Sequence, residues 1–222
     1  KTLYNYIDEG LFAKLTNDDL RKNVVKKRLY HHVRAAYFQK GKSIEERQKE
    51  AENKEIFGHW ELDTVVVKQK TKAAFMVMTE RLKGIEIIRK IESKSQGVFV
   101  RELDKLERRL GTKKFRETFK TITCDNGCEN LDFKGMERSV LTNIPRTQVF
   151  YAHPYSAWER GANECANKLI RRFIPKGADI SKYSKKFIRY IQHWMNNYPR
   201  KKLAWLSPFD ASLPLNLSPN LW

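Results

Sequence analysis

Residues 59–91 read HWELDTVVVKQKTKAAFMVMTERLKGIEIIRKI and contain three apolar runs separated by polar breaks. The runs are rich in Val, Ile, Phe and Met, and each break contains Lys or Gly, a pattern typical of neighbouring strands. The stretch therefore predicts an antiparallel meander of three strands, over residues 59–68, 73–80 and 84–91.

The chain that follows the meander alternates helix-like and strand-like segments. Residues 93–111 carry apolar side chains at near-helical spacing and end at Gly111, a residue type that favours helix ends. The other expected elements are strands near 119–125 and 147–152 and helices near 131–141, 156–173 and 185–198. This order predicts an α/β fold with a mixed five-stranded sheet flanked by helices, in the ribonuclease-H-like arrangement.

Changes in composition along the chain indicate three parts. Residues 1–55 are polar and basic and are expected to form a helical N-terminal extension and linker. Residues 56–176 are expected to form the ribonuclease-H-like core, and residues 177–222 a basic C-terminal helix and tail. Because no apolar stretch is long enough to cross a membrane, we expect a cytoplasmic protein with no membrane partner.

Positive charge dominates the composition of the 222-residue chain, which has 44 Lys and Arg, 26 Asp and Glu, and a net charge of +18. The surplus gathers in two segments: residues 14–42 hold nine basic and two acidic residues, and residues 168–202 hold eleven basic and one acidic. Such one-sided segments repel themselves without a counter-charge, so a polyanion is the expected partner. Nucleic acid is the polyanion that fits best.

The three cysteines, Cys124, Cys128 and Cys165, lack paired CxxC spacing. They predict neither a disulfide framework nor a zinc knuckle, and we expect reduced, structural thiols. A metal site formed by these cysteines with His153 is the weaker alternative.

Two aspartates stand at informative places in the predicted sheet. Asp63 lies inside an apolar strand, where an ionised carboxylate is costly unless it is paired or metal-bound. Asp125 ends another strand and opens an Asp-Asn-Gly turn. Taken singly, each aspartate has a structural explanation. Asp63 can pair with a nearby lysine, and Asp125 can serve as a turn residue. The predicted topology, however, places the two strands side by side and brings the helix that opens at Ser156 across their ends.

Glu159 is the third candidate acid, and it has two interpretations. Ser156 and Glu159 fit a capping box, in which the glutamate side chain accepts a hydrogen bond from the N-cap backbone. Alternatively, Asp63, Asp125 and Glu159 form one metal site, because three carboxylates at one locus need cations to offset their charge. Two Mg²⁺ ions, for which Mn²⁺ is expected to substitute, would then promote displacement at phosphorus. Glu164 is a competing acid, but on a continuous helix it lies about 140° around the axis from Glu159.

The same predicted helix carries a polar line and an apolar stripe. Asn163, Asn167 and Arg171 follow one another at four-residue steps, and Lys168, Arg172 and Lys176 lie near them. These six residues are the expected DNA contacts. The stripe formed by Trp158, Ala162, Cys165, Leu169 and Phe173 is expected to be core.

Four segments resemble the bacterial DDE transposases of the insertion-sequence-thirty family, relatives of retroviral integrases. They are GHWELDTV at 58–65, ITCDNGCEN at 122–130, the run of residues 151–177 that contains WERGANE, and NNYPRKKLAWLSP at 196–208. The resemblance extends from about Lys1 to Asp210, and the 33 residues between Asp125 and Glu159 suit the family's spacing. It implies that Asp63, Asp125 and Glu159 are the DDE triad.

The resemblance also implies a function and an assembly. A DNA transposase cleaves a strand at the element end and joins the freed 3′-OH to target DNA, so double-stranded DNA and a homo-oligomer assembled on it are expected, at the bacterial nucleoid. Two departures stand out: Cys128 occupies a variable position, and Asn130 replaces an aromatic residue. The chain also begins in what resembles the end of an upstream helix-turn-helix region, so recognition of the element ends is expected to be incomplete.

Two other functions remain open. A tyrosine-type recombinase would act without metal ions, so chelation would separate it from a DDE transposase. A catalytically inactive DNA-binding remnant would bind DNA in a salt-sensitive way and would not respond to loss of Asp63 or Asp125.

Overall fold

A computed structural model gives the fold and describes residues 3–14, 41–47, 49, 55–65, 73–127, 130, 132–153 and 156–215. The chain divides into two compact units, residues 1–36 and residues 37–222. Within the first unit the helix α1 (Leu3–Asp8) is described, and Ile7 is buried. The second unit contains the sheet, and the predicted bounds of the core at residues 56–176 stay a prediction.

The second unit is built on a mixed sheet of six strands in the order β1-β6-β5-β2-β3-β4. The strands are β1 (Lys42–Ser43), β2 (His59–Val65), β3 (Ala74–Glu80), β4 (Glu86–Ile91), β5 (Thr121–Cys124) and β6 (Gln148–Tyr151). Strands β2, β3 and β4 form the predicted antiparallel meander, and β5 and β6 continue the sheet in parallel with β2. The predicted ribonuclease-H-like order is confirmed. The predicted number of five strands is wrong by one, because the two-residue strand β1 is too short to produce a sequence pattern.

Helices cover both faces of the sheet. They are α3 (Gln96–Leu110), α4 (Thr112–Thr118), α5 (Phe133–Glu137), α6 (Gly161–Phe173) and α7 (Lys185–Asn197). Short 3₁₀ helices are η1 (Ile44–Glu46), η3 (Ala157–Arg160), η4 (Ile180–Lys182), η5 (Lys201–Leu203) and η6 (Asp210–Leu215). Gly111 ends α3 as predicted, with φ of 78°, a left-handed conformation that glycine adopts without strain. The helix α4, which begins at the next residue, was not predicted.

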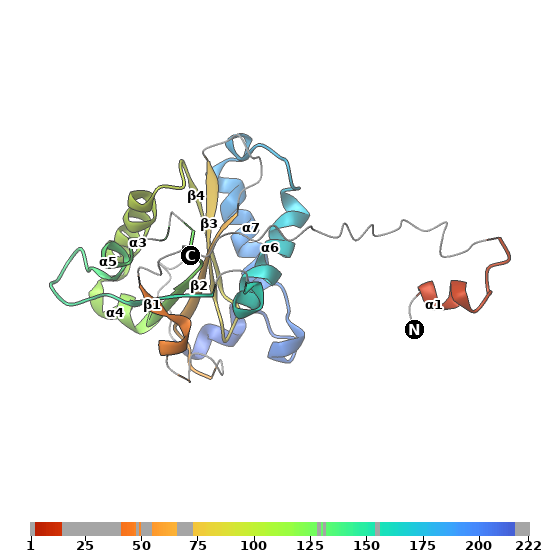
Figure 1. Ribbon diagram of the computed structural model, residues 1–222, viewed down its shortest axis with the longest axis horizontal. Coiled ribbons are helices and arrows are strands. Elements are labelled where there is room, and N and C mark those ends of the chain that lie inside the picture. The colour runs from red at the N-terminus through yellow and green to blue at the C-terminus, as the bar shows by residue number, and fades with distance from the viewer. Residues whose placement is uncertain are drawn as a thin grey trace. The chain divides into compact units, whose positions relative to one another are not determined.

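Successive side chains along a strand point to opposite faces of the sheet. The apolar side chains therefore form two clusters, one on each face of the sheet. Trp60, Leu62 and Met76 point to the cluster under α3 and α4. Val65 and Val77 point to the other cluster, under α6 and α7. Figure 1 shows this layering, with α3, α4 and α5 on one face of the sheet and α6 and α7 on the other.

Side-chain amides of α7 cover the outer edge of β4, on which no strand of the described residues pairs. Asn196 accepts a hydrogen bond from the Glu86 N–H at 2.8 Å and donates one to the Glu86 carbonyl at 2.9 Å. Gln192 accepts from the Ile88 N–H at 2.8 Å. The edge is therefore blocked against the addition of another strand at these residues.

Two general predictions concern membranes and thiols. Among the helices of the described residues, none has the length and apolar character needed to span a membrane. Cys124 is a buried free thiol and Cys165 an exposed one, as expected for reduced cysteines, while Cys128 lies outside the described residues.

Candidate functional site

Two carboxylates lie side by side where adjacent parallel strands end. Asp63 is in β2, and Asp125 directly follows β5. The register pairs Glu61 with Thr123, so the next alternate residues, Asp63 and Asp125, fall at the same level of the sheet. The Asp63 side chain is 18% exposed and that of Asp125 is 39% exposed. The site is therefore open to solvent at its mouth and closed beneath by the sheet.

A single arginine bridges the two aspartates. Nη1 of Arg160 lies 3.2 Å from Oδ1 of Asp63, and its Nη2 lies 3.5 Å from Oδ2 of Asp125. A positive charge between the two acids lowers their mutual repulsion. Sequence analysis did not single out Arg160, although its place next to Glu159 offered a signal.

Helix α6 is attached to β2 by polar groups on one side of its first two turns. Asn167 Nδ2 donates to Asp63 Oδ2 at 2.7 Å, and the Asn163 N–H donates to Glu61 Oε2 at 3.0 Å. Glu61 is itself buried and forms an ion pair with Arg81 at 3.1 Å. Glu61 was also not predicted, but it stands two residues before Asp63 and therefore on the same face of β2.

The loop after β5 orients Asp125. Its Oδ1 accepts from the Gly127 N–H at 3.0 Å and from Asn130 Nδ2 at 2.7 Å. Asn130 is fully buried, and its carbonyl accepts a hydrogen bond from the Tyr151 hydroxyl. The asparagine that replaces the family's aromatic residue thus contributes a fixed donor to the site.

The Glu159 carboxylate contacts His153, and not the N-cap backbone that the capping box predicts. It lies in η3, and its carboxylate accepts from the His153 N–H at 2.8 Å and contacts the His153 ring Nδ1 at 2.8 Å. This carboxylate, through its hydrogen bond and its charge, raises the pKa of His153. The capping box is wrong, because the Ser156 side chain makes no capping bond and Glu159 binds the backbone of His153 instead.

Glu164 stands in the first turn of α6, four residues after Arg160 and three before Asn167. Arg160 and Asn167 both contact Asp63, and within α6 a separation of three residues places Glu164 next to Asn167 on the helix surface. The predicted 140° separation from Glu159 assumed one continuous helix over residues 156–173. That assumption is wrong, since α6 begins only at Gly161. Glu164 is exposed.

The predicted DNA-contacting residues divide into two groups. Lys168, Arg172 and Lys176 are exposed, and Arg171 is partly buried. Asn163 is 2% exposed, so its place in the predicted line along DNA is wrong: this residue faces β2. The side-chain amide of Asn167 donates a hydrogen bond to Asp63.

The predicted apolar stripe is confirmed at Leu169 and Phe173, which pack against the cluster under α6 and α7, and is wrong at Trp158 and Cys165. Ala166 and Ile170 form the buried face of α6, together with Asn163. Trp158 is 77% exposed and Cys165 is exposed, because the break between η3 and α6 changes which side chains face the sheet. An exposed tryptophan next to Glu159 can stack on a base.

The chemistry of the aspartate pair suits a divalent cation. In the described part of the chain, no three His, Cys, Asp or Glu side chains gather closely enough to hold a metal ion. Asp63 and Asp125 nevertheless share one cation already, the Arg160 guanidinium, and carboxylate oxygens are the ligands that Mg²⁺ prefers. The residues present therefore fit a metal that takes the place of this guanidinium.

No protein-family model matches the chain. It is 36% identical over 165 residues to the transposase of insertion sequence element IS4351 of Bacteroides fragilis, covering 74% of this chain and 47% of the relative. It is 32% identical over 203 residues to the probable transposase of IS1161 of Streptococcus salivarius, covering 90% and 54%. It is 30% identical over 172 residues to the transposase InsI of IS30C of Escherichia coli K12, covering 76% and 41%. The chain thus spans about half the length of these curated relatives.

The fold has a solved counterpart. A chain of the simian T-cell lymphotropic virus intasome, determined in complex with a PP2A regulatory subunit, superposes with a TM-score of 0.53 at 13% identity, over 72% of this chain and 56% of that one. This likeness concerns the fold, which is that of an integrase core of the ribonuclease-H type. The sequence matches and the shared fold together show that the chain is similar to the transposases of IS30-like elements and has an integrase-core-like fold.

Proposed function

We propose that this chain is the catalytic core of a DNA transposase, which cuts a phosphodiester at the element end and joins the freed 3′-OH to target DNA. The observation that carries the proposal is the pair Asp63 and Asp125, at neighbouring strand ends and sharing one cation. The relatives named as transposases support the same class of reaction.

Asp63 and Asp125 would hold Mg²⁺ or Mn²⁺, which when bound stabilises charge at the phosphorus centre and activates the attacking oxygen. The protein contributes fixed donors around these acids. Asn167 orients Asp63, and Asn130 with the Gly127 N–H orients Asp125. Arg160 exchanges its carboxylate partners for the phosphate of the substrate, for which its planar guanidinium is well suited.

Glu159 was the predicted third carboxylate, but the geometry supports Glu164. The Glu159 oxygens are engaged by the backbone and ring of His153. Glu164 is next to Asn167 on the surface of α6, and Asn167 donates a hydrogen bond to Asp63. In this proposal Glu159 positions the His153 segment, and Glu164 completes the metal site.

Double-stranded DNA is the proposed substrate, and the exposed cations of α6 and of the segment after it are its proposed contacts. Lys168 and Arg172 are neighbours on the surface of α6, and Lys176 follows the end of the helix, so the three can contact successive phosphates. Trp158, exposed beside the site, can stack on a base near the cleaved bond. A homo-oligomer on DNA stays a prediction, to be tested by sedimentation with and without DNA.

The test is nicking of a labelled duplex in Mg²⁺ or Mn²⁺ and in EDTA. We compare wild type with Asp63→Asn, Glu164→Gln and Glu159→Gln, after confirming folding and DNA affinity for each. We expect metal-dependent nicking that falls at least 100-fold in Asp63→Asn and Glu164→Gln and much less in Glu159→Gln.

Each other outcome has a definite meaning. A large loss in Glu159→Gln alone restores Glu159 as the third ligand. Nicking that persists in EDTA contradicts a DDE mechanism and favours a recombinase. Binding without nicking in any metal identifies an inactive DNA-binding remnant.

A further inference from the structure

Two adjoining hollows run along the β4 edge, between α3 on one face and α7 on the other. Their volumes are about 320 and 830 Å³, and they share the lining residues Lys90, Glu102, Lys105 and Lys185. They form one groove, called the β4 groove below. Asp63 pairs with Val77, which pairs with Ile88, so β4 lies two strands away from the aspartate pair. At the usual spacing this is about 10 Å between strand axes, and the groove is separate from the carboxylates.

The β4 groove is strongly basic. Eight of its lining residues are Lys or Arg, and two, Glu92 and Glu102, are acidic. Both acids are already paired within the groove, Glu92 with Arg101 at 3.1 Å and Glu102 with Lys105 at 2.6 Å. The groove therefore carries a large positive charge that its own acids do not offset.

Arg89 lies at the centre of this charge and is incompletely bonded. Its Nη1 donates to the Ile88 carbonyl and to Gln192 Oε1, both at 3.1 Å. Its Nη2 is buried and has no hydrogen-bond partner among the described residues. Burial, and then the nearby charges of Arg109 and Arg189, lower the pKa of Arg89 to about 10, although Glu102 acts in the opposite direction.

A buried donor without an acceptor destabilises the fold, and so do crowded like charges. An anion that accepts from Nη2 of Arg89 would relieve both. A phosphate oxygen is well suited, because hydrogen bonds between ionised groups are the strong ones. The groove thus has the charge and the free donor of an anion site.

We propose that the β4 groove binds a phosphate of the DNA backbone, as a second contact apart from the catalytic carboxylates. This inference rests on DNA being the substrate. A symmetric contact with a second copy is disfavoured, because it would set this basic face against itself. An added peptide strand is blocked where Asn196 and Gln192 already occupy the β4 backbone.

The test measures affinity for a short fluorescent duplex over a range of salt concentrations. The variants are Arg89→Met, the exposed groove residue Arg189→Gln, and Lys113→Met as a control that removes one exposed charge from α4, outside the groove. Each lost phosphate contact reduces the slope of log affinity against log salt by about 0.9. We expect this change, and a several-fold weaker affinity, in both groove variants and not in Lys113→Met.

The outcomes separate this inference from the proposed function. Groove variants that match Lys113→Met in slope and affinity overturn the inference, even if the wild type nicks DNA. Groove variants that lose DNA affinity uphold it, even if nicking is absent. If the variants change the sedimentation of the DNA-free protein instead, the groove belongs to a second copy and the inference fails. Should Arg89→Met not fold, Arg189→Gln decides.

Discussion

Two clusters in this molecule share one feature, an arginine between two carboxylates, and have opposite surroundings. In the first, Arg146 contacts Asp104 at 2.6 Å and Glu107 at 3.2 Å. In the second, Arg160 contacts Asp63 and Asp125 at 3.2 and 3.5 Å. The side chain of Arg146 is 0% exposed, whereas the second cluster opens to solvent.

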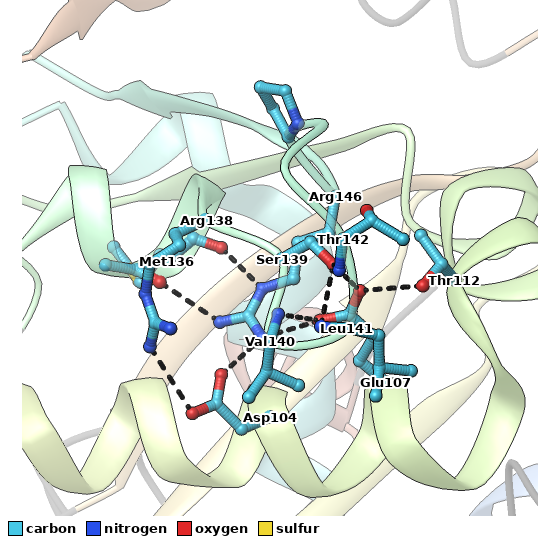
Figure 2. A network of polar contacts seen from close by, with 12 residues as sticks. Asp104, Glu107, Thr112, Met136, Arg138, Ser139, Val140, Leu141, Thr142 and Arg146 are labelled. Carbon is cyan, nitrogen blue, oxygen red and sulfur yellow. Dashed lines mark hydrogen bonds and ion pairs between the residues drawn. The ribbon is translucent and has the colours of Figure 1, made fainter.

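The buried cluster is saturated with hydrogen bonds, as Figure 2 shows. Arg146 also donates to the Met136 carbonyl at 2.8 Å and to the Gly135 carbonyl at 3.1 Å. Glu107 accepts from the Ser139 hydroxyl and the Val140 N–H. Burial acts to raise the pKa of Glu107, but these hydrogen bonds and the Arg146 charge outweigh it, so the pKa is lowered. The cluster ties α3 to the segment that leads into β6.

In the open cluster, the arginine forms fewer hydrogen bonds than its donors allow. The buried Nε of Arg160 has no hydrogen-bond partner in the described residues, and its two contacts with acids are long. A cation held this loosely can be exchanged. The comparison teaches that burial and complete bonding make an arginine structural, whereas openness and incomplete bonding leave the acids available for chemistry.

The largest expected effect is on the buried cluster. Arg146→Met leaves Glu107 without its cation and Asp104 with only the exposed Arg138, 3.6 Å away. Breaking one partner of a buried ion pair costs about 3–5 kcal/mol. Unfolding in urea should show this loss for Arg146→Met and a loss of at most about 1 kcal/mol for Arg160→Met. Equal losses in the two variants would remove the distinction between the clusters.

A third acid extends the comparison, because Glu86 is buried and has no ion-pair partner among the described residues. It accepts from the Thr79 hydroxyl at 2.7 Å, and burial raises its pKa from 4.5 to about 8. The folded state therefore keeps a proton that the unfolded state loses, so stability from this group is full below pH 4.5 and falls as the pH rises to about 8.

Glu86→Gln should remove this pH dependence. We expect the variant to exceed wild type in the free energy of unfolding by about 4 kcal/mol at pH 8. Below pH 4.5 the two should be equal. Urea unfolding at several pH values checks this, and the difference between the proteins cancels other titrating groups. A constant difference across pH would contradict the raised pKa.

The sequence was sufficient for most of the sheet. The three apolar runs in residues 59–91 predicted β2, β3 and β4, because strands covered by helices on both faces are apolar along most of their length. Asp63 and Asp125 could be paired before the structure was known, since they end adjacent strands in the predicted order. The two-residue strand β1 and the helix α4 were missed, because neither carries a hydrophobic period long enough to detect.

The helical part of the site was less predictable. A capping box and a 3.6-residue period both suggested one helix from Ser156, but η3 breaks it before Gly161. This break exposes Trp158, buries Asn163 and turns Glu159 toward His153. Contacts such as Arg160 with Asp63, across 97 positions of sequence, depend on tertiary packing that no local pattern encodes.

The smallest expected change in stability, in Arg160→Met, gives the sharpest test of the open cluster. Removing the guanidinium leaves Asp63 and Asp125 repelling each other but still hydrated, so the loss in metal-free buffer should be at most about 1 kcal/mol. Mg²⁺ no longer competes with Arg160, so the Mg²⁺ concentration that gives half the maximal rise in melting temperature should fall several-fold. Asp63→Asn is the control and should show little rise. If Arg160→Met loses the Mg²⁺ response as Asp63→Asn does, the arginine helps to build the metal site rather than occupying it.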